Sequence, residues 1–129
     1  MGSPSSVPAG FTLIELMIVM SLVGILSVVL LPQYFRTKIQ AEAAISIAET
    51  LSFAEQCAVA NKSGIAVTVQ QPFNGAARIC NGQAVRQINS RTWSGDAAGI
   101  QCLGVTANGS QRRARIRVAT DGSLTCRFI

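Results

Sequence analysis

Histidine is absent from this chain of 129 residues, and charged side chains make up only 13% of it. Histidine is the commonest general base and the commonest metal ligand, so its absence argues against most enzyme classes and most metal sites. Aromatic residues are also few, at 5%. No nucleophile with a base in reach can be nominated. We therefore expect neither catalysis nor a bound cofactor or metal.

The largest feature present is an apolar run of 21 residues, from Phe11 to Leu31. At about 1.5 Å per residue, a helix of this length reaches roughly 31 Å and matches the hydrocarbon thickness of a bilayer. A buried core helix is the alternative, but a chain this short cannot surround a helix that is apolar on every side. The run therefore predicts a membrane-spanning helix.

Three residues of this segment stand out. Glu15 is its sole charge, and a carboxylate in a membrane helix is expected near the end of the span with a specific partner. A tolerated interfacial charge is the alternative. Gly24 weakens a helix, and Pro32 removes a hydrogen bond from one. We expect local bending or melting at these two positions.

The string GFTLIEL at residues 10–16, followed by the apolar run, Pro32 and Tyr34, resembles the N-terminal signature of type IV pilins. The resemblance implies that a prepilin peptidase cuts between Gly10 and Phe11 and that the new amino group of Phe11 is N-methylated. Residues 41–64 are also similar to pilins of cyanobacteria. The leader 1–10 departs from the family because it carries no basic residue, which leaves the membrane orientation under-specified.

The resemblance also implies a role for Glu15. Cleavage creates a cation on Phe11, and in a filament the apolar helices bundle where unpaired charges are costly. In the family, this carboxylate pairs with the N-terminal amine of the neighbouring subunit. We assign Glu15, Gly24 and Pro32 to assembly, with further copies of the chain, the prepilin peptidase/N-methyltransferase and the pilus assembly platform as partners.

Residues 33–62 continue as an amphipathic helix, so that the two halves together form a rod of roughly 50 residues. Its inner stripe is expected to pack closely against a sheet. A dimeric coiled coil is the alternative, but the apolar heptads are too few to sustain one. The predicted stripe consists of Ala44, Ile47, Leu51, Ala54 and Ala58.

Residues 63–129 predict a small β-rich head, with a strand at 65–69 and a hairpin formed by 114–118 and 124–128. Its loop, Thr120-Asp121-Gly122, places glycine where a left-handed backbone is needed. Pairing Val118 with Leu124 puts the apolar residues on one face, and a one-residue slip would destroy this consistency. The fold class is thus α+β, a long N-terminal helix packed on a small antiparallel sheet.

The opposite face of the hairpin is basic. We assign it as a candidate anion-binding face for DNA, acidic polysaccharide or an anionic cell surface. We favour structural or inter-subunit roles over such an external ligand. Arg115 would lie opposite Arg127, and because like charges across a ladder are destabilising, an anionic partner such as a carboxylate of an adjacent subunit is expected. The face comprises Arg112, Arg113, Arg115, Arg117 and Arg127.

Four cysteines lie outside the apolar run without a CxxC pair, which favours disulfides over a zinc site and indicates an oxidising compartment. Three connectivities are open. We favour Cys57 with Cys80 and Cys102 with Cys126, because each closes a local loop that adds roughly 3 kcal/mol. The second would resemble the C-terminal disulfide loop of type IV pilins.

These features predict a leader at 1–10, a transmembrane and assembly helix at 11–32, an amphipathic half at 33–62 and a disulfide-stapled head at 63–129. The predicted function is a type IV pilus subunit for motility, adhesion or DNA uptake, which is a single-pass inner-membrane precursor and then an extracellular filament. The alternatives are a type II secretion pseudopilin or minor pilin, and a DNA-binding receptor for transformation. The head carries only Asp96 and Asp121, too few for the calcium loop of many pseudopilins.

Overall fold

The computed structural model describes residues 10–71, 77–83 and 85–129, so most of the predicted leader lies outside the described residues. The chain forms two compact units, of which the first ends at Tyr34 and the second spans Phe35–Ile129. Helix α1 covers Leu13–Ser63 and is 51 residues long. A single helix of the predicted length is therefore confirmed.

Helix α1 runs through Gly24 and Pro32 without an interruption. The expected melting of the helix at these positions is therefore wrong. Proline removes one N–H donor from a helix interior, but leucine and glutamine, which flank Pro32, are strong helix formers. The single lost hydrogen bond does not end the helix.

The first unit presents its apolar side chains to the outside. Its large hydrophobic residues are between 48% and 83% exposed, from Val19 to Phe11. The two serine hydroxyls of the span bond within the helix, Ser21 Oγ to the Met17 carbonyl at 2.9 Å and Ser27 Oγ to the Val23 carbonyl at 2.7 Å. Such internal bonds leave few polar groups unsatisfied in lipid. Among the described residues, α1 is the one helix long and apolar enough to cross a membrane.

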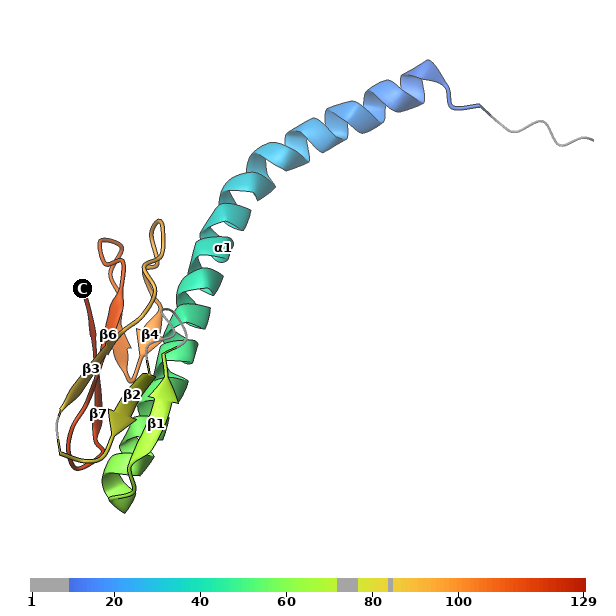
Figure 1. Ribbon diagram of the computed structural model, residues 1–129. Helices are drawn as coiled ribbons and strands as arrows, with labels where there is room; N and C mark the ends of the chain where they lie inside the picture. The colour runs from blue at the N-terminus through green and yellow to red at the C-terminus, as the bar shows by residue number, and fades with distance from the viewer. Residues whose placement is uncertain (1–9, 72–76, 84) are drawn as a thin grey trace, which may run out of the picture. The chain divides into compact units, whose positions relative to one another are not determined.

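The second unit combines the C-terminal part of α1 with seven short antiparallel strands (Figure 1). They form a three-stranded sheet in the order β3-β6-β7 and two separate pairs, β1-β2 and β4-β5. This arrangement confirms the α+β fold class. The strands are β1 (Val67–Gln70), β2 (Ala77–Cys80), β3 (Arg86–Asn89), β4 (Gln101–Cys102), β5 (Val105–Thr106), β6 (Ala114–Val118) and β7 (Leu124–Phe128).

The predicted C-terminal hairpin is confirmed in register. Val118 pairs with Leu124, and Arg115 lies opposite Arg127. The hairpin loop closes with a bond from the Ala119 N–H to the Ser123 carbonyl at 2.9 Å. Gly122 has φ +82°, the left-handed backbone that the loop was expected to need. The sequence did not predict that β3 pairs with the other edge of β6 and makes β6 the central strand.

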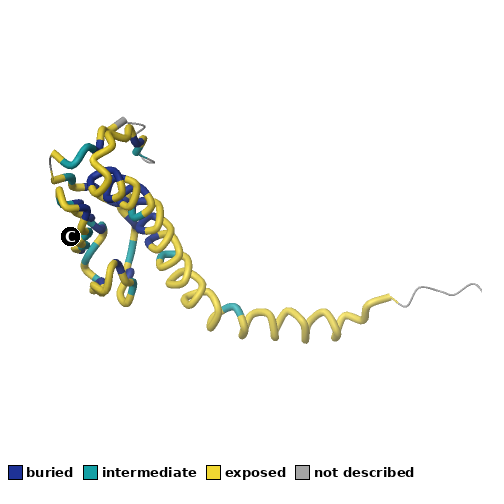
Figure 2. Tube along the Cα trace, turned by 90° about the horizontal axis from the view of Figure 1, so that it is seen from below, coloured by how far each residue is buried: buried dark blue, intermediate teal, exposed yellow. Residues whose placement is uncertain are grey.

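The second half of α1 packs against the strands through one buried side (Figure 2). The prediction of Ile47, Ala54 and Ala58 in this stripe is confirmed, whereas Leu51 is only half-buried. Ala44 is exposed and the neighbouring Ala43 is fully buried, so that part of the prediction is wrong. The buried residues of α1 are Ala43, Ser46, Ile47, Thr50, Phe53, Ala54, Cys57, Ala58, Ala60 and Asn61.

The core of the second unit lies between α1 and the central strand. Ile116 and Val118 of β6 are fully buried, and the Trp93 ring meets the Phe128 ring edge-on with centroids 6.3 Å apart. Trp93 Nε1 donates to the Gln111 carbonyl at 3.1 Å, so that the indole is buried without an unpaired donor.

The end of α1 is joined to two loops by one buried amide. Asn61 Nδ2 donates to the Ala119 carbonyl at 2.8 Å, and Asn61 Oδ1 accepts the Gly82 N–H at 2.7 Å. The side chain thus connects the helix to the β6–β7 loop and to the segment between β2 and β3. It supplies hydrogen-bond partners to two backbone groups that would otherwise need water.

Candidate functional site

The predicted cleavage point lies just before α1. Gly10, Phe11 and Thr12 have no helical conformation, and the helix begins at Leu13. Phe11 is 83% exposed, and apart from its chain neighbours no described residue has an atom within 4 Å of where a Cβ on Gly10 would be. A peptide bond outside regular structure and without packed neighbours is the kind that a peptidase can bind in extended form.

Glu15 lies in the first turn of α1, where its charge is favourable to the helix dipole. Its backbone N–H donates to Thr12 Oγ1 at 3.4 Å, which makes Thr12 the residue that caps the helix. Thr12 was not predicted as the cap from the sequence, although the spacing Thr-x-x-Glu before an apolar run is a known N-terminal signal. The carboxylate itself is exposed and remains available to a partner.

The four cysteines are joined in two pairs, Cys57 with Cys80 and Cys102 with Cys126. This is the pairing that the sequence favoured. The first disulfide connects α1 to β2, and the second connects β4 to β7. The paired cysteines are 23 and 24 residues apart in sequence, so the small head is held together by two covalent links.

The arginines of the hairpin alternate with its buried residues. Arg115 and Arg117 lie on the outer side of β6, and Arg127 lies opposite Arg115 on β7. Arg115 Nε donates to Asn89 Oδ1 of β3 at 3.0 Å. The structure therefore brings three of the predicted arginines together and adds β3 as a polar third strand.

Of the two adjacent arginines before β6, Arg113 lines a groove and Arg112 does not. Arg113 is held by Thr92, whose Oγ1 lies 2.8 Å from Nη2, and lines a groove of about 400 Å³ beside the sheet. Arg112 precedes β6 and is not among the residues that line the groove. Arg78 and Arg91, which the sequence analysis did not single out, do line it. Their segments are far apart in sequence, so no local pattern indicated them.

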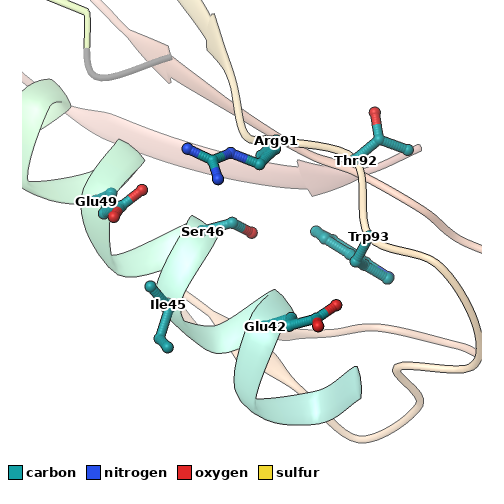
Figure 3. A pocket seen from close by; sticks show the side chains of 7 residues that line it. All are labelled: Glu42, Ile45, Ser46, Glu49, Arg91, Thr92 and Trp93. Atoms are coloured by element: carbon teal, nitrogen blue, oxygen red, sulfur yellow. The ribbon is translucent and has the colours of Figure 1, made fainter. Parts of the chain in front are cut away.

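A second hollow of about 350 Å³ lies between α1 and the segment after β3, and Figure 3 shows its side chains. Arg91 extends toward Glu49, and Glu42 points toward Trp93. Arg91 lines both this hollow and the arginine-lined groove. This hollow combines two carboxylates, a guanidinium and a buried indole.

Residues 7–31 match the family described as the prokaryotic N-terminal methylation motif. The chain carries this methylation motif. The matched residues include Gly10, Phe11, Glu15 and Gly24. No curated protein and no solved structure matches the chain.

The methylation motif supports a type IV pilin-like or pseudopilin precursor. A motif of this kind implies processing by a prepilin peptidase and suggests a structural subunit rather than an enzyme. Together with the apolar helix, it fits a precursor that is anchored in a membrane. The similarity of residues 41–64 to cyanobacterial pilins gains no support from the comparisons.

Proposed function

We propose that this chain is the structural subunit of a type IV pilus, cut after Gly10, N-methylated on Phe11 and polymerised through its N-terminal helix into an extracellular filament. The observation that carries the proposal is the exposed apolar helix that begins within the methylation motif. A helix that is apolar on all sides is stable only in lipid or among other apolar helices. The precursor would hold this helix in the membrane, and the filament would hold it among the helices of other subunits, so that it is covered in both states.

The charges at the start of the helix support assembly in a defined register. Cleavage before Phe11 leaves a cationic amine just ahead of the first turn, which holds Glu15. In a bundle that excludes water, each of these charges requires an opposite one. Pairing the amine of one copy with the carboxylate of the next fixes their relative position along the filament. Gly24 allows close approach because no side chain protrudes there.

The two disulfides support export of the head, because disulfides persist in oxidising compartments outside the cytoplasm. The precursor would then span the inner membrane with its head on the outer side. A type II secretion pseudopilin or a minor pilin has the same N-terminal design, and the motif applies to both. The abundance of the chain in sheared surface filaments distinguishes them, since a major subunit dominates such a preparation.

The test uses Glu15→Gln, which keeps the size and helix propensity of the side chain but removes its charge. We expect normal membrane insertion and a filament yield at least about tenfold lower, because the amine of the next subunit lacks its partner. Ser27→Ala serves as a control in the same helix, since the Ser27 hydroxyl bonds only within the helix. A normal yield of filaments from Glu15→Gln would exclude the charge pairing.

A further inference from the structure

The arginines on the outer side of the head form one continuous basic surface. We define the arginine surface as Arg78, Arg113, Arg115, Arg117 and Arg127. The residues between them are neutral hydrogen-bonding side chains that complete two rows across the sheet. One row is Asn89–Arg115–Arg127 and the other is Gln87–Arg117–Thr125. The groove that Arg78 and Arg113 line also contains Gln87 and Asn89, so it opens onto the same two rows.

The arginines of this surface are positioned by the fold. Arg115 is held by Asn89, and Arg113 by Thr92. Arg78, Arg117 and Arg127 are exposed. A guanidinium has five N–H donors in a planar fork, so one bond to a neighbour orients it and leaves donors for a ligand. The surface therefore offers an anion two arginines that a neighbouring side chain orients, Arg113 and Arg115, beside three exposed ones.

The carboxylates of the head are too few to balance its arginines. Eight arginines follow Gly64 in the sequence, but only two aspartates do. Both aspartates bond to their own turns, Asp96 Oδ1 with the Ala98 N–H at 2.8 Å and Asp121 Oδ1 with the Ser123 N–H at 2.9 Å. Three glutamates remain on the second half of α1. A filament of such subunits is strongly cationic and attracts an external polyanion.

The chemistry of the surface favours a ligand that presents phosphates on its outside. Arginine binds phosphate through two parallel hydrogen bonds, and amide side chains also donate to phosphate oxygens. Stacking of unpaired bases needs exposed aromatic rings. Among the described residues of the head, the aromatic side chains of Trp93 and Phe128 are buried. Duplex DNA needs no such rings, since its backbone is contacted by charge and hydrogen bonds.

We propose that the arginine surface binds the phosphate backbone of double-stranded DNA without reading its sequence. The full chain in a neutral detergent is titrated into a labelled duplex of arbitrary sequence at several salt concentrations, and anisotropy reports binding. We expect the affinity to fall linearly with salt on logarithmic axes and to be the same for a second, unrelated duplex. Absence of binding at low salt would overturn the proposal.

The decisive variant is the double substitution Arg117→Gln and Arg127→Gln, at two exposed positions. Loss of two phosphate contacts should weaken binding roughly tenfold or more and reduce the salt slope by about 2. The matched control, Arg36→Gln with Lys38→Gln, removes the same charge from exposed helix positions and should change the affinity by less than about threefold. Equal losses in both variants would show that net charge alone governs binding and would overturn the assignment.

Two further measurements distinguish a duplex-binding surface from a misfolded variant and from a polysaccharide site. The charge-keeping variant Arg117→Lys with Arg127→Lys should retain most of the affinity, and unchanged fluorescence of the buried Trp93 confirms that each variant is folded. An acidic polysaccharide, polygalacturonate, is used as a competitor. If it displaces the duplex at equal or lower concentration of charged groups, the surface is a polysaccharide site and the DNA proposal is wrong. Duplex binding by the full chain does not depend on cleavage after Gly10. Mass spectrometry measures that cleavage separately, so the DNA proposal and the pilus proposal can fail independently.

Discussion

Replacement of Asn61 by alanine tests how the end of α1 is held to the head. The Asn61 side chain is 8% exposed and bonds two backbone groups, the Ala119 carbonyl at 2.8 Å and the Gly82 N–H at 2.7 Å. Asn61→Ala leaves both groups without this partner in a part-buried place. Helix propensity changes in the opposite direction, because alanine is the better helix former.

The magnitude follows from the two lost bonds. A buried donor or acceptor without a partner costs about 1 to 3 kcal/mol, and a gain of up to about 0.7 kcal/mol in helix propensity offsets part of this. We therefore expect Asn61→Ala to lower the free energy of unfolding of the head by about 2 to 4 kcal/mol. Such a loss is a large share of the stability of a small domain.

Urea unfolding followed by Trp93 fluorescence measures this loss in the full chain in detergent. Trp93 is the single tryptophan and is 4% exposed, so its emission reports the core of the head. Gln56→Ala is the control, because it removes an amide from an exposed position of the same helix and should change stability by less than about 0.5 kcal/mol. A loss from Asn61→Ala no larger than that of the control would refute the reasoning.

Three more changes test the head. Replacing Cys102 and Cys126 together by serine opens a link across 24 residues and should lower the free energy of unfolding by roughly 3 kcal/mol, as measured by urea unfolding; an unchanged midpoint would contradict this. Gly122→Ala should cost about 2 kcal/mol or more in the same assay, because the backbone is left-handed and a Cβ there would lie 2.7 Å from the Ala58 carbonyl oxygen; a neutral result would show that the loop readily moves away from α1. Hydrogen bonds from the Ser123 N–H and hydroxyl lower the pKa of Asp121 below its ordinary value of 3.8. The ionised carboxylate therefore stabilises the folded head fully above pH 3.8, and this stabilisation is lost as the pH falls through the lowered pKa. An NMR titration that places the Asp121 pKa above 3.8 would contradict this.

The C-terminal hairpin was predictable because the residues that determine its register lie within one short stretch of the sequence. Ala114, Ile116 and Val118 alternate with arginines, and Gly122 fits the left-handed position of the loop, so one register satisfies the burial of both strands. The membrane-spanning helix was equally predictable, because a chain of this length cannot bury a helix that is apolar on every side. Strand β3 was missed because its sequence, Arg-Gln-Ile-Asn, has a single apolar residue and becomes a strand by pairing with β6.

The buried stripe of α1 was predicted one residue out of place at Ala44. Ala43 and Ala44 are equivalent in the sequence, and the side that faces the sheet is decided by larger neighbours. Ser46, Thr50 and Asn61 are also buried, although polar residues are usually placed outside. Ser46 and Thr50 bond to carbonyls of their own helix, which makes their burial inexpensive. Such compensation depends on packing and leaves no signature in the pattern.

The candidate sites also differ in whether the sequence alone reveals them. The methylation motif is contiguous, so Gly10, Phe11 and Glu15 were evident from the sequence. The arginine surface is assembled from β2, β6, β7 and the residue before β6, and Arg78 joins it only through the fold. Arg112 and Arg113 both precede β6, but only Arg113 lines the groove beside the sheet.

The central claim is that this chain is a precursor trimmed to a filament-forming subunit. The most direct measurement is the intact mass and N-terminal sequence of the chain recovered from the membranes and the sheared surface filaments of cells that carry a prepilin peptidase. The account predicts a chain that begins at Phe11 with one added methyl group and that is present in the filaments. Recovery of only the uncut chain, still beginning at Met1, would contradict it.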